Sequence, residues 1–466
     1  MKILYEDNHI IVVVKPVNMP VQADETGDPD LLTRVKAYIK EKYAKPGEVY
    51  CGLVHRLDRP VGGVMVFART SKAASRLMPQ FAQKGGAGAE KRYAAVVCGE
   101  PLPYVPAIVE CWMKKDEAER KSYVVPEGTE GAKKAVLERR TVCVKDGLSL
   151  VDVSLRSGRH HQIRVQLSSA GNPIWGDQKY NPEAVPGQQI ALFAYSLTFE
   201  HPTTHERMTF TALPEGGAWE RFGDEMRLLS AGVSCVFSDP DLLIINKPAG
   251  VTVANADGGE DTLESRIASA GIKAYPVHRL DAKTSGLIIF ARNERAKAAL
   301  DEAMRARTIK KCYRAIVRGV PETEKGVRYG TLKFHAVKDP AAGLIRVYDG
   351  PRAGALEMET FFRICRTDGN ISFVEAELVT GRTHQIRASF AHIGCPILGD
   401  DKYGDREFNR DPAYKALKKS APLCLTSTGL VFGFPEGSYL ERLNGAAVRI
   451  EAPFEKEMKL WCASKR

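Results

Sequence analysis

Short runs of apolar, mostly β-branched residues recur along the chain, separated by longer segments in which apolar and charged positions mix. The runs have the length and composition of strands, as in HIIVVVKP (9–16), GVMVFAR (63–69), YAAVVCG (93–99) and LSLVDVSL (148–155). Segments 70–83 and 293–307 are rich in Ala, Leu, Lys and Arg, and each has a residue that can cap a helix, Ser71 or Asn293, near its start. Because the strands cluster without regular β-α-β alternation, we predict an α+β fold with a mainly antiparallel mixed sheet flanked by helices.

The same pattern occurs twice along the chain. Several segments recur in the same order, namely 4–21 as 236–253, HRLD at 55–58 and 278–281, K-x-Y at 91–93 and 311–313, GRHHQIR (158–164) as GRTHQIR (381–387), and NPIWGDQKY (172–180) as CPILGDDKY (395–403). In both copies 106 residues separate the Asp of HRLD from the last Arg of H-Q-I-R. Chance does not produce so many coincidences in register, so we interpret the chain as a tandem duplication.

A tight turn is predicted after the first buried strand of each copy. Lys15-Pro16 and Lys247-Pro248 are followed two residues later by Asn18 and Gly250. Both residue types tolerate a positive φ, which most residues avoid.

Composition limits the class of protein. A chain of 466 residues is too long for one hydrophobic core, and we expect two domains, 1–225 and 226–466. The net charge of +10 suits a polyanionic partner such as nucleic acid. Ten cysteines without a C-x-x-C pair argue against a zinc ribbon and indicate free thiols in a reducing compartment. Neither a signal peptide nor an uncharged apolar stretch of about 18 residues is visible, so we expect a cytoplasmic protein without a membrane span.

Three polar clusters recur in each copy: HRLD, the Tyr of K-x-Y, and R-x-H-Q-I-R. In a single copy each has an ordinary explanation, respectively a surface salt-bridge loop, a core aromatic and a solvated strand face. Their joint recurrence at matched spacing, while the surrounding apolar positions vary, favours a functional constellation. A packing constraint alone does not require the Asp and the Arg to keep one separation in both copies.

The chemistry follows if the Asp and the distant Arg meet. Charge-assisted hydrogen bonds then hold the Asp ionised and in a fixed direction, as a carboxylate nucleophile or a stabiliser of an oxocarbenium-like centre requires. A glycosidase usually needs a second carboxyl group to protonate a poor leaving oxygen. A nucleobase delocalises negative charge onto its own carbonyl groups, so one Asp suffices. The single carboxylate, the aromatic partner and the basic chain together favour chemistry on a nucleoside in RNA.

On these motifs each half resembles the RluA-type pseudouridine synthases, which isomerise uridine to pseudouridine in ribosomal and transfer RNA. The resemblance covers nearly the whole of each half and implies two copies of the pseudouridine synthase fold. It implies that the Asp of HRLD is catalytic, that the Tyr packs against the target base and serves in proton abstraction from C5, and that the last Arg of H-Q-I-R pairs with the Asp. The residues implied are Asp58 and Asp281, Tyr93 and Tyr313, and Arg164 and Arg387.

The resemblance also implies an everted target uridine and an RNA partner, with no membrane and no obligatory protein partner. The chemistry requires no cofactor and no metal, and the chain has no P-loop, H-E-x-x-H or G-x-G-x-x-G motif. Positive and imidazole groups flanking the motifs are expected to bind RNA: Arg56 and Arg279, Lys91 and Lys311, Arg159 and Arg382, and His161 and His384.

The copies differ from one another after HRLD. The second has Thr284-Ser285-Gly286, as family members often do, whereas the first has Val61-Gly62-Gly63. We expect the first copy to lack two hydroxyl groups near the pocket mouth but to remain active. Other hypotheses stay open: one half is catalytic and the other positions RNA, the chain is a non-catalytic RNA-binding protein, or it releases the free base as an RNA glycosidase.

Overall fold

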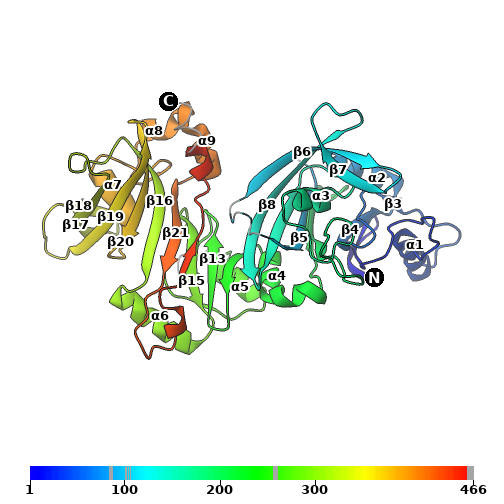
Figure 1. Cartoon of the computed structure of the whole chain (residues 1–466), viewed down its shortest axis with the longest axis horizontal. Coiled ribbons are helices and arrows are strands. Elements are labelled where there is room, and N and C mark those ends of the chain that lie inside the picture. Colours follow the sequence, from blue (N-terminus) through cyan, green and yellow to red (C-terminus); the bar gives the residue numbers. More distant parts are fainter. Residues whose placement is uncertain (83–87, 100–101, 103, 105, 255–260, 459–466) are drawn as a thin grey trace. The chain divides into compact units, whose positions relative to one another are not determined.

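The computed structural model describes residues 1–82, 88–99, 102, 104, 106–254 and 261–458. The chain divides into two compact units, Met1–Ser230 and Ala231–Arg466. Each unit is built around one sheet with helices beside it (Figure 1). The predicted α+β class with a mainly antiparallel mixed sheet is confirmed.

The first unit has its strands in the order β1-β2-β4-β10-β5-β9-β8-β6-β7, with β3 paired to β4 and β11 to β10. Among the described strands of this unit, all pairings are antiparallel except β4 with β10. The strands are β1 Lys2–Glu6, β2 Ile10–Lys15, β3 Gly52–Leu53, β4 Gly62–Ala68, β5 Glu90–Val97, β6 Ala107–Asp116, β7 Lys121–Val125, β8 Lys133–Lys145, β9 Leu148–Leu155, β10 Leu192–Glu200 and β11 Arg207–Thr211.

The second unit repeats this order as β12-β13-β15-β21-β16-β20-β19-β17-β18, with β14 paired to β15 and β22 to β21. Its one parallel pairing among the described strands is again the equivalent one, β15 with β21. The strands are β12 Ser234–Ser238, β13 Leu242–Lys247, β14 Tyr275–Pro276, β15 Ser285–Ala291, β16 Lys310–Arg318, β17 Tyr329–Asp339, β18 Leu344–Tyr348, β19 Leu356–Thr367, β20 Ile371–Leu378, β21 Leu425–Val431 and β22 Ala447–Arg449.

Helices cover parts of each sheet. In the first unit α2 packs against β4 and β10 and α3 against β7, while in the second α6 packs against β15 and α7 against β18 and β19. The helices are α1 Leu31–Lys42, α2 Ser71–Ala82, α3 Gln162–Ser169, α4 Gly223–Ser230, α5 Leu263–Ser269, α6 Glu294–Ala306, α7 Gln385–His392, α8 Arg406–Arg410 and α9 Lys415–Ser420, with short 3-10 turns at Gly217–Phe222, Pro412–Tyr414 and Glu441–Leu443.

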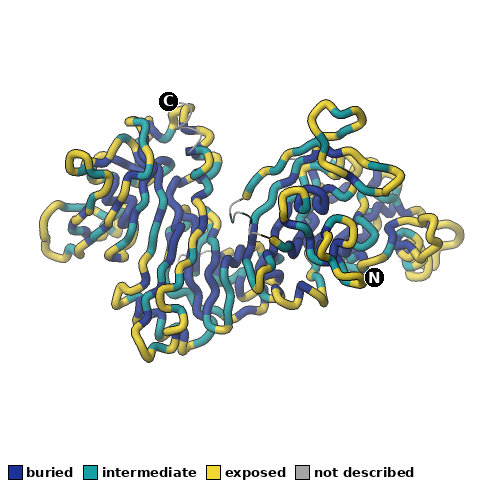
Figure 2. The backbone as a smooth tube through the Cα atoms, in the orientation of Figure 1, coloured by how far each residue is buried: buried dark blue, intermediate teal, exposed yellow. Residues whose placement is uncertain are grey.

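The apolar run of β2 is continuous rather than alternating because both faces of the strand are buried. Ile11 and Val13 join one hydrophobic cluster with residues of α1, and Ile10 and Val12 join another with residues of α2. Buried backbone accordingly follows the central strands of each unit in Figure 2.

Local predictions about turns and caps hold with one correction. Asn18 and Gly250 have φ values of 59° and 92°, as predicted for the turn after Lys-Pro. Asn293 caps α6, accepting a hydrogen bond from the backbone N–H of Ala296. The cap of α2 is Thr70 and not Ser71, since the Thr70 hydroxyl accepts from the N–H of Ala73 at 3.1 Å.

The nine cysteines in the described part of the chain are free thiols. Within the described ranges, no helix combines the length and the apolar character needed to cross a membrane.

Candidate active site

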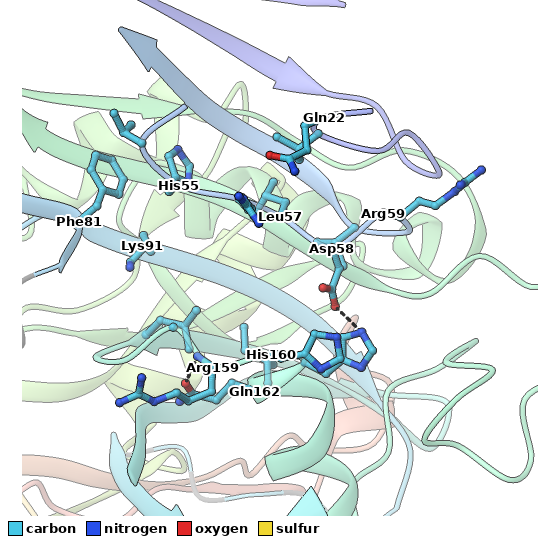
Figure 3. A pocket seen from close by; sticks show the side chains of 18 of the residues that line it. Gln22, His55, Leu57, Asp58, Arg59, Phe81, Lys91, Arg159, His160 and Gln162 are labelled. Carbon is cyan, nitrogen blue, oxygen red and sulfur yellow. Dashed lines mark hydrogen bonds and ion pairs between the residues drawn. The ribbon is translucent and has the colours of Figure 1, made fainter. Parts of the chain in front are cut away.

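The first unit contains a cavity of about 1060 Å³ in which the recurring motifs meet. Its wall includes the HRLD loop before β4, Tyr93 from β5, and the GRHHQIR segment at the start of α3. The Asp58 side chain points into this space toward imidazole groups at the end of α3 (Figure 3). Segments about 106 residues apart in the sequence therefore form one site.

The second unit has the equivalent cavity, of about 470 Å³. HRLD, Tyr313 and the GRTHQIR segment line it. A second hollow of about 670 Å³ shares Asp281, His384 and Arg387 with it, so the carboxylate faces both spaces.

The His of HRLD anchors the loop from inside the protein. Nε2 of His55 accepts a hydrogen bond from the backbone N–H of Val66 at 3.2 Å, and His278 accepts one from Ile289 at 3.1 Å. Burial lowers the pKa of His55 and of His278 to about 3, so both rings are neutral acceptors at neutral pH. The Leu of the motif is buried in both copies, which leaves the Asp to face the cavity.

The Asp of HRLD and the last Arg of H-Q-I-R are in contact in both units. Arg164 Nη1 lies 3.4 Å from Asp58 Oδ2, and Arg387 Nη1 donates to Asp281 Oδ2 at 2.9 Å. The two carboxylates are 27% and 26% exposed, whereas the guanidinium side chains are 5% and 4% exposed. Each Asp is therefore held from the protein side and open on the cavity side.

A second carboxylate, which our reading of the sequence did not assign a role, fixes each Arg. Arg164 donates from Nε and Nη2 to Asp177 at 2.8 and 2.6 Å, and Arg387 donates likewise to Asp400 at 2.7 and 2.8 Å. Both acidic residues are buried. This fork-to-fork arrangement is the strong form of the Arg–carboxylate pair. The sequence feature that pointed to these acidic residues is the Gly-Asp-x-x-Tyr segment, which recurs in both copies.

The charges of these pairs are mutually stabilised. Burial by itself would lower the pKa of Arg387, but hydrogen bonds and charges from Asp400 and Asp281 raise it. Burial would likewise raise the pKa of Asp400, and the Arg387 hydrogen bond and charge, with backbone N–H groups of Lys402 and Tyr403, lower it instead. The Arg therefore remains a cation beside the cavity at all ordinary pH values.

Tyr93 and Tyr313 lie in the cavity walls beside the Asp. Both are buried, at 7% and 5% exposed. Burial raises the pKa of each phenol, and the charge of Asp58 or Asp281 raises it further. Both side chains are therefore neutral phenols at neutral pH.

The R-x-H-Q-I-R segment starts a buried helix and is not a solvated strand face. His161 and His384 adopt left-handed backbone conformations, with φ of 53° and 54°, directly before α3 and α7. Each places Nδ1 at 2.8 Å from a tyrosine hydroxyl, Tyr180 or Tyr403, and not against the backbone or the Arg. Their Nε2 atoms lie 3.6 and 3.7 Å from the Oδ2 of the respective Asp. Burial, followed by the charge of Arg164, lowers the pKa of His161 to about 2.

Two fully buried lysines also support the site, although the sequence assigned them no function beyond marking the strand and turn that recur in both copies. Lys15 Nζ donates to the carbonyl groups of Pro16 and Arg59, both at 2.9 Å. Lys247 Nζ donates to three carbonyl groups, including that of Ala282 at 2.9 Å. Arg59 and Ala282 directly follow the Asp of HRLD. Each lysine therefore ties the HRLD loop to the end of the strand that carries it, β2 or β13.

The remaining predicted RNA-binding residues are placed differently from one another. Arg56 and Arg279 are exposed at the cavity edge. Arg159 and Arg382 donate from Nε to the carbonyl groups of Lys134 and Glu357, at 3.0 and 3.3 Å. The ammonium groups of Lys91 and Lys311 line the cavities, and burial lowers the pKa of both.

The residues after HRLD, which differ between the copies, serve partly to pack the sheet. Ser285 is buried and shares a 2.9 Å hydrogen bond with the Thr426 hydroxyl, so the expectation that both hydroxyl groups lie at the pocket mouth is wrong for Ser285. In the first unit Gly62 stands at this position opposite Phe193, and a Cβ on Gly62 would lie 2.9 Å from the Phe193 ring. The second unit thus has a hydrogen bond between Ser285 and Thr426 where the first has Gly62 packed against the ring of Phe193.

The arrangement offers an oriented carboxylate, a neutral phenol and a cationic rim around a space large enough for a nucleotide. Within the described residues, no group of three or more His, Cys, Asp or Glu side chains is placed to hold a metal ion. The geometry suits attack at, or charge stabilisation of, an electrophilic carbon.

The family model described as RNA pseudouridylate synthase matches residues 9–169 and 241–392. A Bacillus subtilis protein named uncharacterized RNA pseudouridine synthase YhcT is 35% identical over 241 residues, which is 49% of this chain and 70% of that protein. Ribosomal large subunit pseudouridine synthase C of Haemophilus influenzae is 32% identical over 48% of this chain and 66% of its own length.

Among solved structures, human RNA pseudouridylate synthase domain containing 4 aligns with 46% of this chain and 88% of its own, at 22% identity and a TM-score of 0.39. The two segments that match the family model contain the HRLD and H-Q-I-R motifs of the respective halves. The chain belongs to the RNA pseudouridylate synthase family and carries that family's domain twice.

Proposed function

We propose that each half of the chain isomerises uridines of structured RNA to pseudouridine with its own aspartate, Asp58 in the first half and Asp281 in the second. The observation that carries this proposal is the recurrence of one cavity-facing carboxylate held by a buried, doubly anchored Arg. Ribosomal RNA is the first substrate to test, because a relative that matches about half of the chain is named for the large ribosomal subunit.

In the proposed reaction the target uridine leaves its stack and enters the cavity, at a cost of about a few kcal/mol. The Asp carboxylate attacks C1′ of the ribose, or stabilises positive charge there, as the bond between C1′ and N1 breaks. The uracil takes the electron pair, turns while held, and its C5 forms the new bond to C1′. Loss of the C5 proton and protonation of N1 complete an isomerisation in which no atom is gained or lost.

Tyr93 and Tyr313 are assigned to the base. Each buried ring packs against the uracil and retains it between bond breaking and bond formation, when escape competes with recapture. The phenol accepts the C5 proton as it passes its own proton to the Asp carboxylate. This relay avoids a free phenolate, which the raised pKa of the buried phenol disfavours.

The exposed arginines at the cavity edge, Arg56 and Arg279, are assigned to RNA phosphates. We assign the same partner to Lys91 and Lys311 at the cavity wall. The protein acts without an obligatory protein partner. We place it in the cytoplasm, where free thiols persist.

The test uses RNA from cells that lack the gene, labelled with tritium at uridine C5. Formation of pseudouridine releases the label, because C5 exchanges hydrogen for a carbon bond. Wild type, Asp58→Asn, Asp281→Asn and the double variant are compared, with Asp146→Asn and Asp301→Asn as matched controls at exposed carboxylates outside the cavities. We expect release in each single variant and none in the double variant, with both controls like wild type.

Other outcomes favour other hypotheses. Loss of all release in one single variant would assign the reaction to that half and leave the other as an RNA-positioning module. Release that persists in the double variant would remove both aspartates from the mechanism. RNA binding without release by the wild type would favour a non-catalytic binding protein, and free uracil among the products would indicate a glycosidase.

A further inference from the structure

His160 distinguishes the first site from the second. It stands between Arg159 and His161 in GRHHQIR, where the second copy has Thr383. Its side chain lines the first cavity and is exposed. Figure 3 shows His160 in the wall of the cavity that Asp58 faces, at the N-terminal end of α3. Neither the recurring motifs nor the mechanism proposed above uses this residue.

The imidazole of His160 is held in a fixed orientation. It stacks on the His161 ring, with centroids 3.7 Å apart and planes 27° apart. Its Nδ1 is hydrogen-bonded to the Ser122 hydroxyl on β7 at 2.9 Å. The ring beneath is itself anchored, because His161 Nδ1 meets the Tyr180 hydroxyl at 2.8 Å.

The second unit lacks both the imidazole and the hydroxyl group that bonds to it. Ile345 is equivalent to Ser122, since its backbone N–H donates to the Tyr403 hydroxyl at 2.8 Å as that of Ser122 donates to Tyr180. The pair Ser122 and His160 is thus replaced by Ile345 and Thr383. Ring and hydroxyl occur together in one copy and are absent together in the other.

The imidazole of His160 is suited to stack, in its neutral form, against a base. The partial burial of the ring lowers its pKa, the charge of Asp58 acts in the opposite direction, and the cations Lys115 and Lys179 reinforce the lowering. A neutral imidazole has a flat π face on which a base placed next to the target uridine can stack. Stacking of a base on an aromatic side chain strengthens RNA binding by roughly 5- to 140-fold.

We propose that His160 is a specificity residue of the first site, which stacks on a base of the RNA adjacent to the everted uridine, so that the two halves select differently built RNA targets. This inference rests on the proposed function of the first half. Because the ring is already oriented by Ser122 and His161, little conformational freedom is lost when a base stacks on it.

The test isolates one site at a time. In Asp281→Asn protein, where only the first site is intact, His160→Thr imitates the second copy and His160→Phe keeps a flat ring. We expect His160→Thr to raise KM for C5-tritiated ribosomal RNA about tenfold with kcat within about twofold, and His160→Phe to stay within about threefold of the parent KM. Equal KM values in the parent and in His160→Thr, or equal losses in both variants, would overturn the stacking role.

The reciprocal change provides the control. In Asp58→Asn protein, Ile345→Ser together with Thr383→His installs the pair in the second site, and we expect the preference of that site among tritiated RNA fragments to move toward that of the first. An unchanged preference would contradict a specificity role.

Filter binding of the same RNA to Asp58→Asn/Asp281→Asn protein, with and without His160→Thr, separates the two proposals. Absence of tritium release from Asp281→Asn protein counts against the proposed function of the first half. Equal RNA binding by the Asp58→Asn/Asp281→Asn protein with and without His160→Thr counts against the stacking role of His160.

Discussion

Arg387 and Asp400 are joined by two parallel hydrogen bonds, from Nε at 2.7 Å and from Nη2 at 2.8 Å. With two of its three nitrogens engaged in this way, the guanidinium plane cannot turn. The remaining nitrogen, Nη1, then faces Asp281 at 2.9 Å. In the proposed reaction Asp400 acts on the Asp281 carboxylate through the Arg, and is therefore a positioning residue.

Asp400→Asn is expected to weaken both folding and catalysis. It removes the buried anion of Arg387 and leaves the partly exposed Asp281 as the nearest one, which should lower the free energy of unfolding by about 3 kcal/mol. Loss of the fixed plane should lower kcat of the second site about 100-fold, measured by tritium release in Asp58→Asn protein. Asp401→Asn is the control, because Asp401 is 54% exposed and its oxygen lies 3.9 Å from Arg387. Equal stability losses in Asp400→Asn and Asp401→Asn would contradict the clamp.

Tyr93→Phe tests the proton relay separately from packing. The ring remains against the base while the hydroxyl is lost, so KM should stay within about threefold and kcat should fall about 100- to 10,000-fold. The measurement is tritium release by the first site in Asp281→Asn protein. Tyr313→Phe in Asp58→Asn protein is the matched variant. Wild-type kcat in either phenylalanine variant would assign the C5 proton to another acceptor.

Acid should destabilise both units through the buried histidines of HRLD. The pKa of His278 is about 3 in the folded chain and about 6.5 when unfolded, so the unfolded chain binds the proton first as pH falls. Stability is therefore lost between about pH 6.5 and about pH 3, by about 2 kcal/mol per histidine at pH 5. Denaturant titration near neutral pH and near pH 5 measures this loss.

His278→Asn should reduce the loss of stability on acidification, because an amide oxygen can accept from Ile289 N–H without titrating in this range. His392→Asn is the control, since His392 bonds to the exposed Asp349 instead. A steep loss that persists in His278→Asn would assign the acid sensitivity to other groups.

Gly286 should tolerate no side chain. It has φ of 109°, and a Cβ would lie 2.1 Å from the carbonyl oxygen of Ser427 on the parallel neighbouring strand. Gly286→Ala is therefore expected to lower the free energy of unfolding by more than about 3 kcal/mol. Gly250→Ala is the matched control, because its φ of 92° is also positive but nothing lies within 4 Å, and only about 1 to 2 kcal/mol should be lost. Similar losses in a thermal melt would show that φ alone governs both sites.

Much of the architecture could be read from local pattern. The continuous apolar run of β2 and the Asn-capped helix α6 follow from side-chain chemistry within one segment. The duplication followed from comparing the copies, because so many segments recur in the same order and register. The pairing of Asp58 with Arg164 was implied by the resemblance to the RluA-type synthases, and the structure has these side chains in contact. Pattern and repetition thus determined the fold class and the two copies, and the resemblance supplied the central ion pair.

Tertiary structure decided which polar groups serve that ion pair. Asp177 and Lys15 were visible as recurring letters, but their functions depend on partners brought together only by the sheet order, Arg164 for the one and the Arg59 carbonyl for the other. His160 and Ser122 meet for the same reason. Hydrophobic periodicity specifies which face of an element is buried, whereas a buried charge is stable only where the fold supplies its counter-charge or hydrogen-bond partners, and those come from distant segments.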